Sequence, residues 1–376
     1  MAGIYLHIPF CKQACHYCDF HFSTSLKNKK EFLKALQKEV FLRKDYLRTK
    51  EISTVYFGGG TPSVLSKEEI LEVFSALSNY FSIDPDAEIT LEANPEDLSK
   101  QKLKDLSETP VNRLSIGIQS FSDEDLKFLN RVHTAREASG SVKEAQDTGF
   151  KNITIDLIYG IQTLTHDQWK KNMEQAFALN VPHISCYSLT VEDGTALANY
   201  IKKGTMPVVS SEKSADQFEM LMNEMKRNGF IQYEISNFCK EGFESKHNNS
   251  YWQGETYLGL GPSAHSFDGV SRQWNISSNA AYLSAVKKGE LPAEAEVLTE
   301  TQKFNEYVLT ALRTNKGMDL NFVREKFPSA YYSLLQDGLI DFIKQKLVLQ
   351  KKNKIILSDK GKLFADKIAS DLFLVS

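Results

Sequence analysis

Six short β-rich segments, separated by helix-like segments, constrain the fold of this 376-residue chain more than any other feature of its sequence. The β-rich segments are residues 4–8, 53–57, 88–93, 113–118, 152–159 and 183–189. Between the first two, a helical period is carried by Phe32, Leu36 and Val40, and Ser66 is a favourable N-cap for the next helix. Strand, helix and strand repeated in this way predict an α/β fold around a parallel sheet with right-handed crossovers. An open sheet and a partial barrel would both fit this pattern.

Polar residues and glycines gather at the carboxyl ends of these segments. They are Cys11 after the first segment, Gly58, Gly59, Gly60 and Thr61 after the second, Glu92 at the end of the third, Gln119 after the fourth and Asp156 inside the fifth. Parallel α/β folds place their ligand sites at the carboxyl ends of the strands. The sequence therefore predicts that these residues form a single site. By itself, however, the glycine run is explained more simply by a tight turn between strand and helix.

Composition excludes several classes of protein. With 45 basic and 48 acidic side chains the net charge is −3, so no overall positive field would attract nucleic acid or an anionic membrane. The first residues lack the charged and apolar regions of a signal peptide, and no stretch reaches the roughly 18 apolar residues of a membrane span. We therefore expect a cytoplasmic protein. In that reducing compartment five cysteines, three of them clustered, indicate metal binding or chemistry rather than disulfides.

The clustered cysteines, Cys11, Cys15 and Cys18, are spaced C-x3-C-x2-C. A structural zinc site needs about four ligands, so His16 or His21 would have to complete it. Three thiolates would instead leave one iron of a 4Fe–4S cluster without a protein ligand, and that iron could bind a substrate or cofactor. The spacing alone leaves the cluster, a zinc site and unliganded thiols open.

The segment CKQACHYC, residues 11–18, resembles the cysteine loop of radical S-adenosylmethionine (SAM) enzymes, and YFGGGTPS, residues 56–63, resembles their glycine-rich motif. The resemblance covers nearly the whole chain and is greatest to the group of the oxygen-independent coproporphyrinogen III oxidases and the HemW heme chaperones. It implies a partial (βα)6 radical SAM barrel, a 4Fe–4S cluster held by the three cysteines, and SAM chelated by the iron that they leave free. Without the resemblance, Arg131 would be interpreted as a solvated charge at a helix end. The residues that the resemblance implies in contacts with SAM are Tyr5, Tyr17, Gly58, Gly59, Gly60, Thr61, Glu92, Gln119, Arg131, Asp156 and Thr190.

A second motif, HNNSYW at residues 247–252, matches the HNxxYW pattern of the HemW group. The resemblance implies that His247 is an axial ligand of heme iron and that Tyr251 and Trp252 contact the porphyrin. Neutral imidazole is a common heme ligand, and aromatic rings pack well on a flat macrocycle. On residue type alone, a loop histidine beside two aromatic residues would more often be a hydrogen-bonded packing residue. His265 and His133 are weaker candidates for the iron ligand.

Two departures separate this chain from the oxidases of that group. Their cysteine loop continues to a fourth cysteine where this chain has Phe20, and they carry a long N-terminal extension where only four residues precede Tyr5. We therefore expect a heme chaperone that binds a 4Fe–4S cluster, SAM and heme and passes heme to acceptor proteins, respiratory enzymes at the membrane surface among them. The alternative is a radical SAM oxidoreductase that acts on a porphyrinogen, although coproporphyrinogen oxidase activity is not expected. No catalytic residue is assigned.

The rhythm of strands and helices changes after about residue 200, and we divide the chain accordingly. We expect residues 1–205 to form the partial barrel, residues 206–297 an α+β connecting region with the HNxxYW motif, and residues 298–376 a small winged-helix-like domain. A capping box of Thr299 and Gln302 begins the first helix of that domain. Lysines crowd its expected wing, but lysine on a hairpin is usually a solvated edge, so no nucleic-acid partner is expected. These lysines are Lys344, Lys346, Lys351, Lys352 and Lys354.

Overall fold

The computed structural model describes residues 2–375 and contains all six expected strands as parallel neighbours in one sheet. The strands are β1 (Ala2–Ile8), β2 (Glu51–Gly59), β3 (Ser82–Ala93), β4 (Arg113–Gln119), β5 (Asn152–Tyr159) and β6 (His183–Ser188). Their order in the sheet is their order along the chain, so each crossover leads to the neighbouring strand. The helices of this part are α1 (Lys29–Leu42), α2 (Lys67–Ser78), α3 (Lys100–Ser107), α4 (Asp123–Phe128), α5 (Ala135–Asp147), α6 (His166–Ala178) and α7 (Ala196–Lys202). Single turns of 3-10 helix follow β2 (Pro62–Val64) and β3 (Pro95–Asp97).

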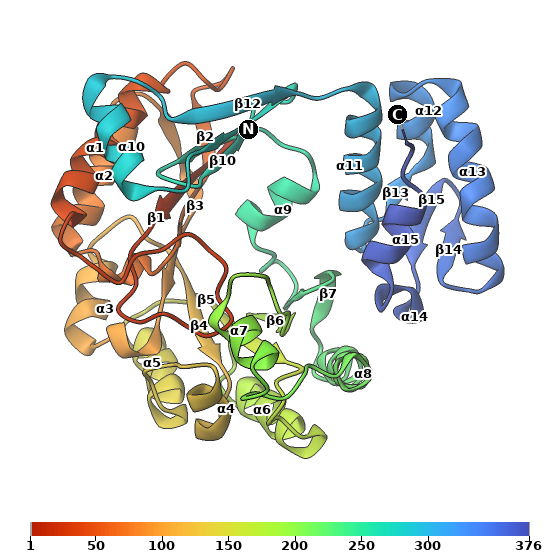
Figure 1. Cartoon of the computed structure of the whole chain (residues 1–376), viewed down its shortest axis with the longest axis horizontal. Helices are drawn as coiled ribbons and strands as arrows, with labels where there is room; N and C mark the ends of the chain where they lie inside the picture. The colour runs from red at the N-terminus through yellow and green to blue at the C-terminus, as the bar shows by residue number, and fades with distance from the viewer. Residues whose placement is uncertain (1, 376) are drawn as a thin grey trace.

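The two faces of this sheet differ in polarity because the strand sequences alternate. Leu114, Ile116 and Ile118 of β4 lie on the outer face, where they are fully buried and where the helices cover the sheet (Figure 1). Arg113 and Ser115 alternate with them and therefore point to the inner face. Parallel sheets covered by helices on both faces are usually apolar on both. Here only the outer face is apolar and covered by helices. The inner face carries polar side chains, which can contact a ligand.

Residues 206–297 widen the sheet at both edges. β8 pairs antiparallel with β6 and β7 with β8, while β9 pairs parallel with β1 and leads on to β10, β11 and β12. Leu258 and Leu260 of β9 lie in the same hydrophobic core as the strands of the first part, so no break in the core marks residue 205. The boundary expected there stays a prediction. The elements are α8 (Ser211–Arg227), β7 (Ile231–Glu234), β8 (Asn237–Cys239), α9 (Lys246–Trp252), β9 (Tyr257–Leu260), β10 (His265–Phe267), β11 (Ser271–Asn275), α10 (Asn279–Lys288) and β12 (Ala293–Val297).

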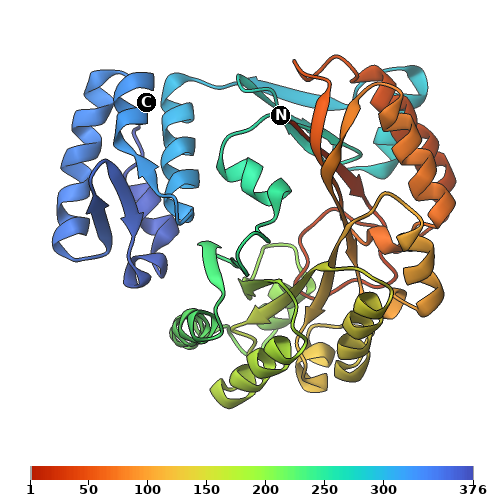
Figure 2. The same cartoon turned by 180° about the vertical axis from the view of Figure 1, so that it is seen from behind.

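The C-terminal part of the chain has a hydrophobic core of its own, which begins at Phe304. The expected capping box of Thr299 and Gln302 is present at the start of its first helix. In both views this part stands beside the sheet, and α9 lies in the space between the sheet and α11 (Figures 1 and 2). The elements are α11 (Glu300–Arg313), β13 (Met318–Asp319), α12 (Leu320–Lys326), α13 (Ser329–Lys344), the hairpin of β14 (Val348–Lys351) and β15 (Lys354–Leu357), α14 (Asp359–Lys362) and α15 (Ala365–Asp371). None of the helices within residues 2–375 has the length and apolar composition that crossing a membrane requires.

Candidate functional site

Two cavities lie on the inner face of the sheet. The first, which we call the cysteine cavity, has a volume of about 990 Å³ and is lined by Cys11, Cys15 and Cys18. The second, which we call the aromatic cavity, has a volume of about 1200 Å³ and lies between the sheet and the C-terminal part of the chain. The exposed side chain of Phe20 lines both cavities, so the two are neighbours.

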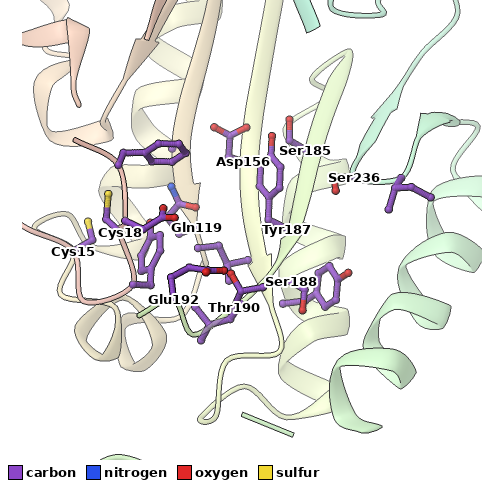
Figure 3. A pocket seen from close by; sticks show the side chains of 18 of the residues that line it. Cys15, Cys18, Gln119, Asp156, Ser185, Tyr187, Ser188, Thr190, Glu192 and Ser236 are labelled. Carbon is purple, nitrogen blue, oxygen red and sulfur yellow. The ribbon is translucent and has the colours of Figure 1, made fainter. Parts of the chain in front are cut away.

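Most of the residues predicted to bind the cluster and SAM line the cysteine cavity. They are Cys11, Cys15, Tyr17, Cys18, Gly59, Gly60, Thr61, Glu92, Gln119, Arg131, Asp156 and Thr190. Figure 3 shows Cys15 and Cys18 on one side of this cavity, Asp156 on the other, and Gln119 between them. Two predicted residues lie elsewhere. Tyr5 lines the aromatic cavity, and Gly58 lies where a Cβ atom would come within 2.9 Å of the rings of both Tyr5 and Tyr56.

The loop that carries the cysteines leads from β1 to α1, and hydrogen bonds join its beginning to the segment near Ser23. The backbone N–H of Cys11 donates to the carbonyl of Ser23 at 3.0 Å, and the N–H of Ser23 donates to the carbonyl of Pro9 at 2.9 Å. Phe10 is buried and packs edge-on against Phe32 of α1, with ring centroids 5.3 Å apart. These contacts hold the first cysteine at the carboxyl end of β1.

The two histidines that could have completed a zinc site are engaged elsewhere. Nδ1 of His16 lies 2.8 Å from the carbonyl oxygen of Phe128, and Nε2 of His21 lies 2.8 Å from Oδ1 of Asn279. Each histidine keeps its second ring nitrogen without a hydrogen-bond partner among residues 2–375, and a metal-ligating histidine commonly donates its other ring N–H in this way, so these contacts do not decide between a zinc site and a cluster. Three thiolates fit a cluster that leaves one iron without a protein ligand.

Two hydrogen-bond donors point at the cysteine sulfurs. The hydroxyl of Thr61 donates to Sγ of Cys11 at 3.3 Å, and Nη1 of Arg131 donates to Sγ of Cys15 at 3.4 Å. Donors to sulfur stabilise the thiolate form and tune a bound cluster. Burial raises the pKa of Cys18 to about 12, so a metal would have to displace the thiol proton when it binds.

Arg131 is held among polar groups and keeps one donor free. Its Nη2 donates to Oδ1 of Asn94 at 2.7 Å and to the carbonyl of Gly117 at 2.8 Å. Its buried Nε has no acceptor among residues 2–375. Nearby, Gln119 has a φ of 69°, which is uncommon for a residue other than glycine. A buried donor without a partner and a strained backbone are typical of a ligand-binding cavity.

Backbone geometry requires glycine at the carboxyl end of β2. Gly59 has a φ of 105°, which side-chain-bearing residues rarely adopt. A Cβ atom at Gly60 would come within 2.8 Å of the backbone nitrogen and oxygen of Phe10. The turn interpretation of the glycine run is therefore confirmed, and the turn packs against the cysteine loop. Contact of these glycines with SAM stays a prediction.

Two buried carboxyl groups from β3 and β5 have raised pKa values. Burial raises the pKa of Glu92 to about 7 although Tyr56 donates a hydrogen bond to it at 2.8 Å, and the neighbouring charge of Asp156 adds to the increase. Burial likewise raises the pKa of Asp156 to about 6 although the hydroxyl of Ser115 donates to it at 3.3 Å. Carboxylates at strand ends suit the hydroxyl groups of a ribose.

We expect the affinity for SAM to fall as the pH is lowered from 8 to 5.5. Glu92 and Asp156 take up protons as the pH falls through about 7 and about 6, and a neutral carboxyl is a poorer acceptor for hydroxyl or ammonium groups. Calorimetric titration of cluster-loaded protein with SAM at several pH values measures this dependence. Glu92→Gln should bind SAM weakly. In this variant the curve of SAM affinity against pH should be flatter in its upper part. Glu174→Gln, on the exposed face of α6, should reproduce the parent curve, and a parent affinity independent of pH would contradict the expectation.

Sequence reasoning missed several residues of the cysteine cavity. Tyr56, Asn94 and Ser185 line it, and Tyr56 hydrogen-bonds Glu92 while Asn94 holds Arg131. Tyr56 and Ser185 occupy inward positions of β2 and β6, where polar side chains alternate with buried aliphatic ones. That alternation was the signal that could have identified them.

The aromatic cavity contains part of the HNxxYW motif. Tyr251 and Trp252 of α9 line it, as the prediction of a heme site requires. Further aromatic rings come from the sheet and from the C-terminal part of the chain, so the cavity has aromatic side chains on more than one wall. These are Tyr5, Tyr257, Phe267, Tyr307, Phe322 and Phe327.

His247, in contrast, is buried beneath this cavity with both ring nitrogens engaged. Nδ1 lies 2.7 Å from the hydroxyl of Thr54, and Nε2 lies 2.7 Å from the hydroxyl of Tyr251. The His247 side chain is about 1% exposed, and burial lowers its pKa to about 3. Coordination of heme iron by His247 stays a prediction that requires one of these two hydrogen bonds to break. His133 is similarly engaged, by Glu96 at 3.1 Å and the carbonyl of Ile118 at 3.0 Å.

A polar contact from β3 fixes α9 at its N-terminus. The carboxylate of Glu88 accepts hydrogen bonds from the backbone N–H groups of Lys246 at 3.1 Å and His247 at 3.0 Å. Asn248 lines the cysteine cavity, whereas Asn249, Tyr251 and Trp252 line the aromatic cavity. The helix therefore forms part of the partition between the two cavities.

The parallel strands and the cysteine loop at their carboxyl ends define a radical SAM protein. The model of the Radical SAM superfamily matches residues 5–176. The chain is 34% identical over 371 residues to the heme chaperone HemW of Bacillus subtilis, covering 98% of each chain, and 35% identical to HemW of Lactococcus lactis, covering 95% of this chain and 93% of that protein. The solved structure of the Escherichia coli coproporphyrinogen III oxidase HemN superposes with a TM-score of 0.86, covering 99% of this chain and 90% of that chain; at 23% identity this shows a shared fold. The chain belongs to the family of the HemW heme chaperones.

Proposed function

We propose that this protein binds heme in the aromatic cavity and passes it to acceptor proteins, using a radical SAM scaffold. Similarity to HemW proteins over nearly the full length of the chain supports the proposal. The observation that carries it is the aromatic cavity itself, because its lining includes Tyr251 and Trp252 of the HNxxYW motif. A flat porphyrin is bound well by aromatic faces that exclude water.

In this proposal the cysteine cavity holds the cluster and SAM. Cys11, Cys15 and Cys18 supply the thiolates, and the free Nε of Arg131 is a donor for a bound group. Glu92 and Asp156 accept hydrogen bonds from the nucleoside when they are ionised. When bound, the reduced cluster supplies the electron for cleavage of SAM. α9 separates this chemistry from the heme.

We also propose a description of two parts of the fold, the class of heme acceptors and the cellular location of the protein. The six parallel strands form a partial barrel, and residues 298–376 form a winged-helix-like domain that covers the aromatic cavity. The acceptors are heme proteins, respiratory enzymes at the membrane surface among them, and the protein works in the cytoplasm. Lys354 of the expected wing is paired with Asp319 at 3.0 Å and lines the aromatic cavity, which supports a role toward heme rather than nucleic acid.

The decisive experiment gives the cluster-loaded protein hemin and, separately, coproporphyrinogen III with SAM and a reductant. We expect a shifted Soret band with hemin and no decarboxylated product by chromatography, because Phe20 stands where the oxidases have a fourth cysteine. Formation of protoporphyrinogen would overturn the proposal in favour of a radical SAM oxidoreductase acting on a porphyrinogen. Absence of any heme complex would overturn it as well.

A further inference from the structure

Three histidines lie in or beside the aromatic cavity, and they differ in the availability of their ring nitrogens. Both nitrogens of His247 are engaged by Thr54 and Tyr251, as described above. His7 lines the cavity, but its Nε2 lies 2.8 Å from the carbonyl oxygen of His21 and its Nδ1 lies 3.3 Å from the hydroxyl of Tyr5. His265 lines the cavity and is exposed, and neither of its nitrogens has a hydrogen-bond partner within residues 2–375.

We infer that His265 supplies the axial nitrogen to the iron of a heme bound in the aromatic cavity, and that the carboxylate groups of this heme face Lys316 and Lys326. The inference rests on the proposed function, since it names the iron ligand of the same heme. It gives His247 a different task, which is to position the hydroxyl and ring of Tyr251. His247 is thus a positioning residue rather than an iron ligand.

Strand register places His265 among the aromatic rings that would contact the porphyrin. Residues paired directly across neighbouring strands share a face of the sheet. His265 pairs with Trp274 and Phe267 with Tyr257, and on the next strand Tyr5 pairs with Gly259, two residues from Tyr257. The imidazole therefore projects from the same face as Tyr5, Tyr257 and Phe267. Partial desolvation in the cavity, together with the charge of Arg272, lowers the pKa of His265 and so favours the neutral ring, the form that coordinates iron.

The charges at the rim of the cavity match a dicarboxylate ligand. Five cationic side chains line the cavity, and three of them already have carboxylate partners within about 3 Å: Arg272 with Glu306, Lys303 with Glu300 and Lys354 with Asp319. The other two, Lys316 and Lys326, are exposed and form no ion pair among the residues that the structure describes. Two unpaired ammonium groups beside an aromatic cavity suit a flat ring that carries two carboxylates.

The test is a hemin titration of the cluster-loaded full chain, followed by Soret absorbance. We expect His265→Ala to weaken binding by about tenfold or more, which corresponds to about 1.4 kcal/mol, and to change the position of the Soret band. Free imidazole should restore the parent band in His265→Ala, because it can occupy the vacated coordination position. His265→Gln, which keeps a polar side chain on this short strand, should lose the band in the same way. His247→Ala should keep the band position of the parent.

Two controls separate failure of this inference from failure of the proposed function. His166→Ala, on the exposed start of α6, should titrate as the parent does, and Lys316→Ala with Lys326→Ala should lower affinity without moving the band. If the parent binds hemin and His265→Ala is indistinguishable from it, His265 is not the ligand and the proposed function stands. A band lost in His247→Ala but kept in His265→Ala would return the ligand to the HNxxYW motif. If the parent binds no hemin, the proposed function itself fails.

Discussion

Replacing Cys15 by alanine is expected to leave the protein without its 4Fe–4S cluster. The cluster in this proposal is attached by three thiolates, and removal of one leaves two of the four irons without protein ligands. The alanine also leaves Nη1 of Arg131 without the sulfur to which it donates at 3.4 Å. Iron and sulfide content after anaerobic reconstitution measures the effect, and we expect Cys11→Ala and Cys18→Ala to give the same loss.

The remaining cysteines provide matched controls. Cys186 of β6 and Cys239 of β8 are both buried at about 1% exposure and lie outside the cysteine loop. Cys239→Ala should therefore keep a full complement of iron and sulfide. Iron content in Cys15→Ala equal to that of the parent would show that the cluster, if present, is held in another way.

Much of the architecture could be predicted because the strand sequences alternate between polar and aliphatic residues. In β5 the run from Thr154 to Leu157 alternates in this way, and the same period recurs in the other central strands. The third strand is longer than expected, since it begins at Ser82 rather than Glu88. Its first half contains Pro85 between two aspartates, and this composition argues against a strand. The strand can still form there because this stretch is exposed.

The arrangement around the aromatic cavity could not be predicted, because it depends on contacts between distant parts of the chain. No local pattern indicates that β9 returns to pair with β1, or that Glu88 binds the start of α9. Both contacts decide which face of the HNxxYW helix is buried. Residue type correctly indicated a histidine that packs and forms hydrogen bonds at position 247, whereas the family pattern indicated an iron ligand. The two hydrogen bonds of His247 agree with the first interpretation, and its role as iron ligand stays a prediction.

Replacing Arg113 by methionine is expected to destabilise the fold by about 3–5 kcal/mol, the cost of breaking a buried ion pair from one side. Arg113 is about 1% exposed, and its Nε lies 3.8 Å from the carboxylate of Glu88, which is also buried. Its guanidinium also donates to the hydroxyls of Thr90 and Thr154 on the neighbouring strands. Methionine fills much of the same volume but leaves the Glu88 charge and both hydroxyls without this partner. Urea unfolding of the full chain should show the loss as a lower midpoint.

Comparison with an exposed arginine and with a double variant tests this physical cause. Arg136→Met, on the exposed face of α5, should change stability by no more than about 0.5 kcal/mol. Glu88→Gln removes the charge that Arg113→Met leaves without a cationic partner, while its amide oxygen can still accept the backbone N–H of His247, so Glu88→Gln combined with Arg113→Met should be more stable than Arg113→Met alone. If the two changes were simply additive, the ion pair would not be the source of the loss. The shape of Arg113 and its bonds to the two threonines would then account for the stability of the inner face.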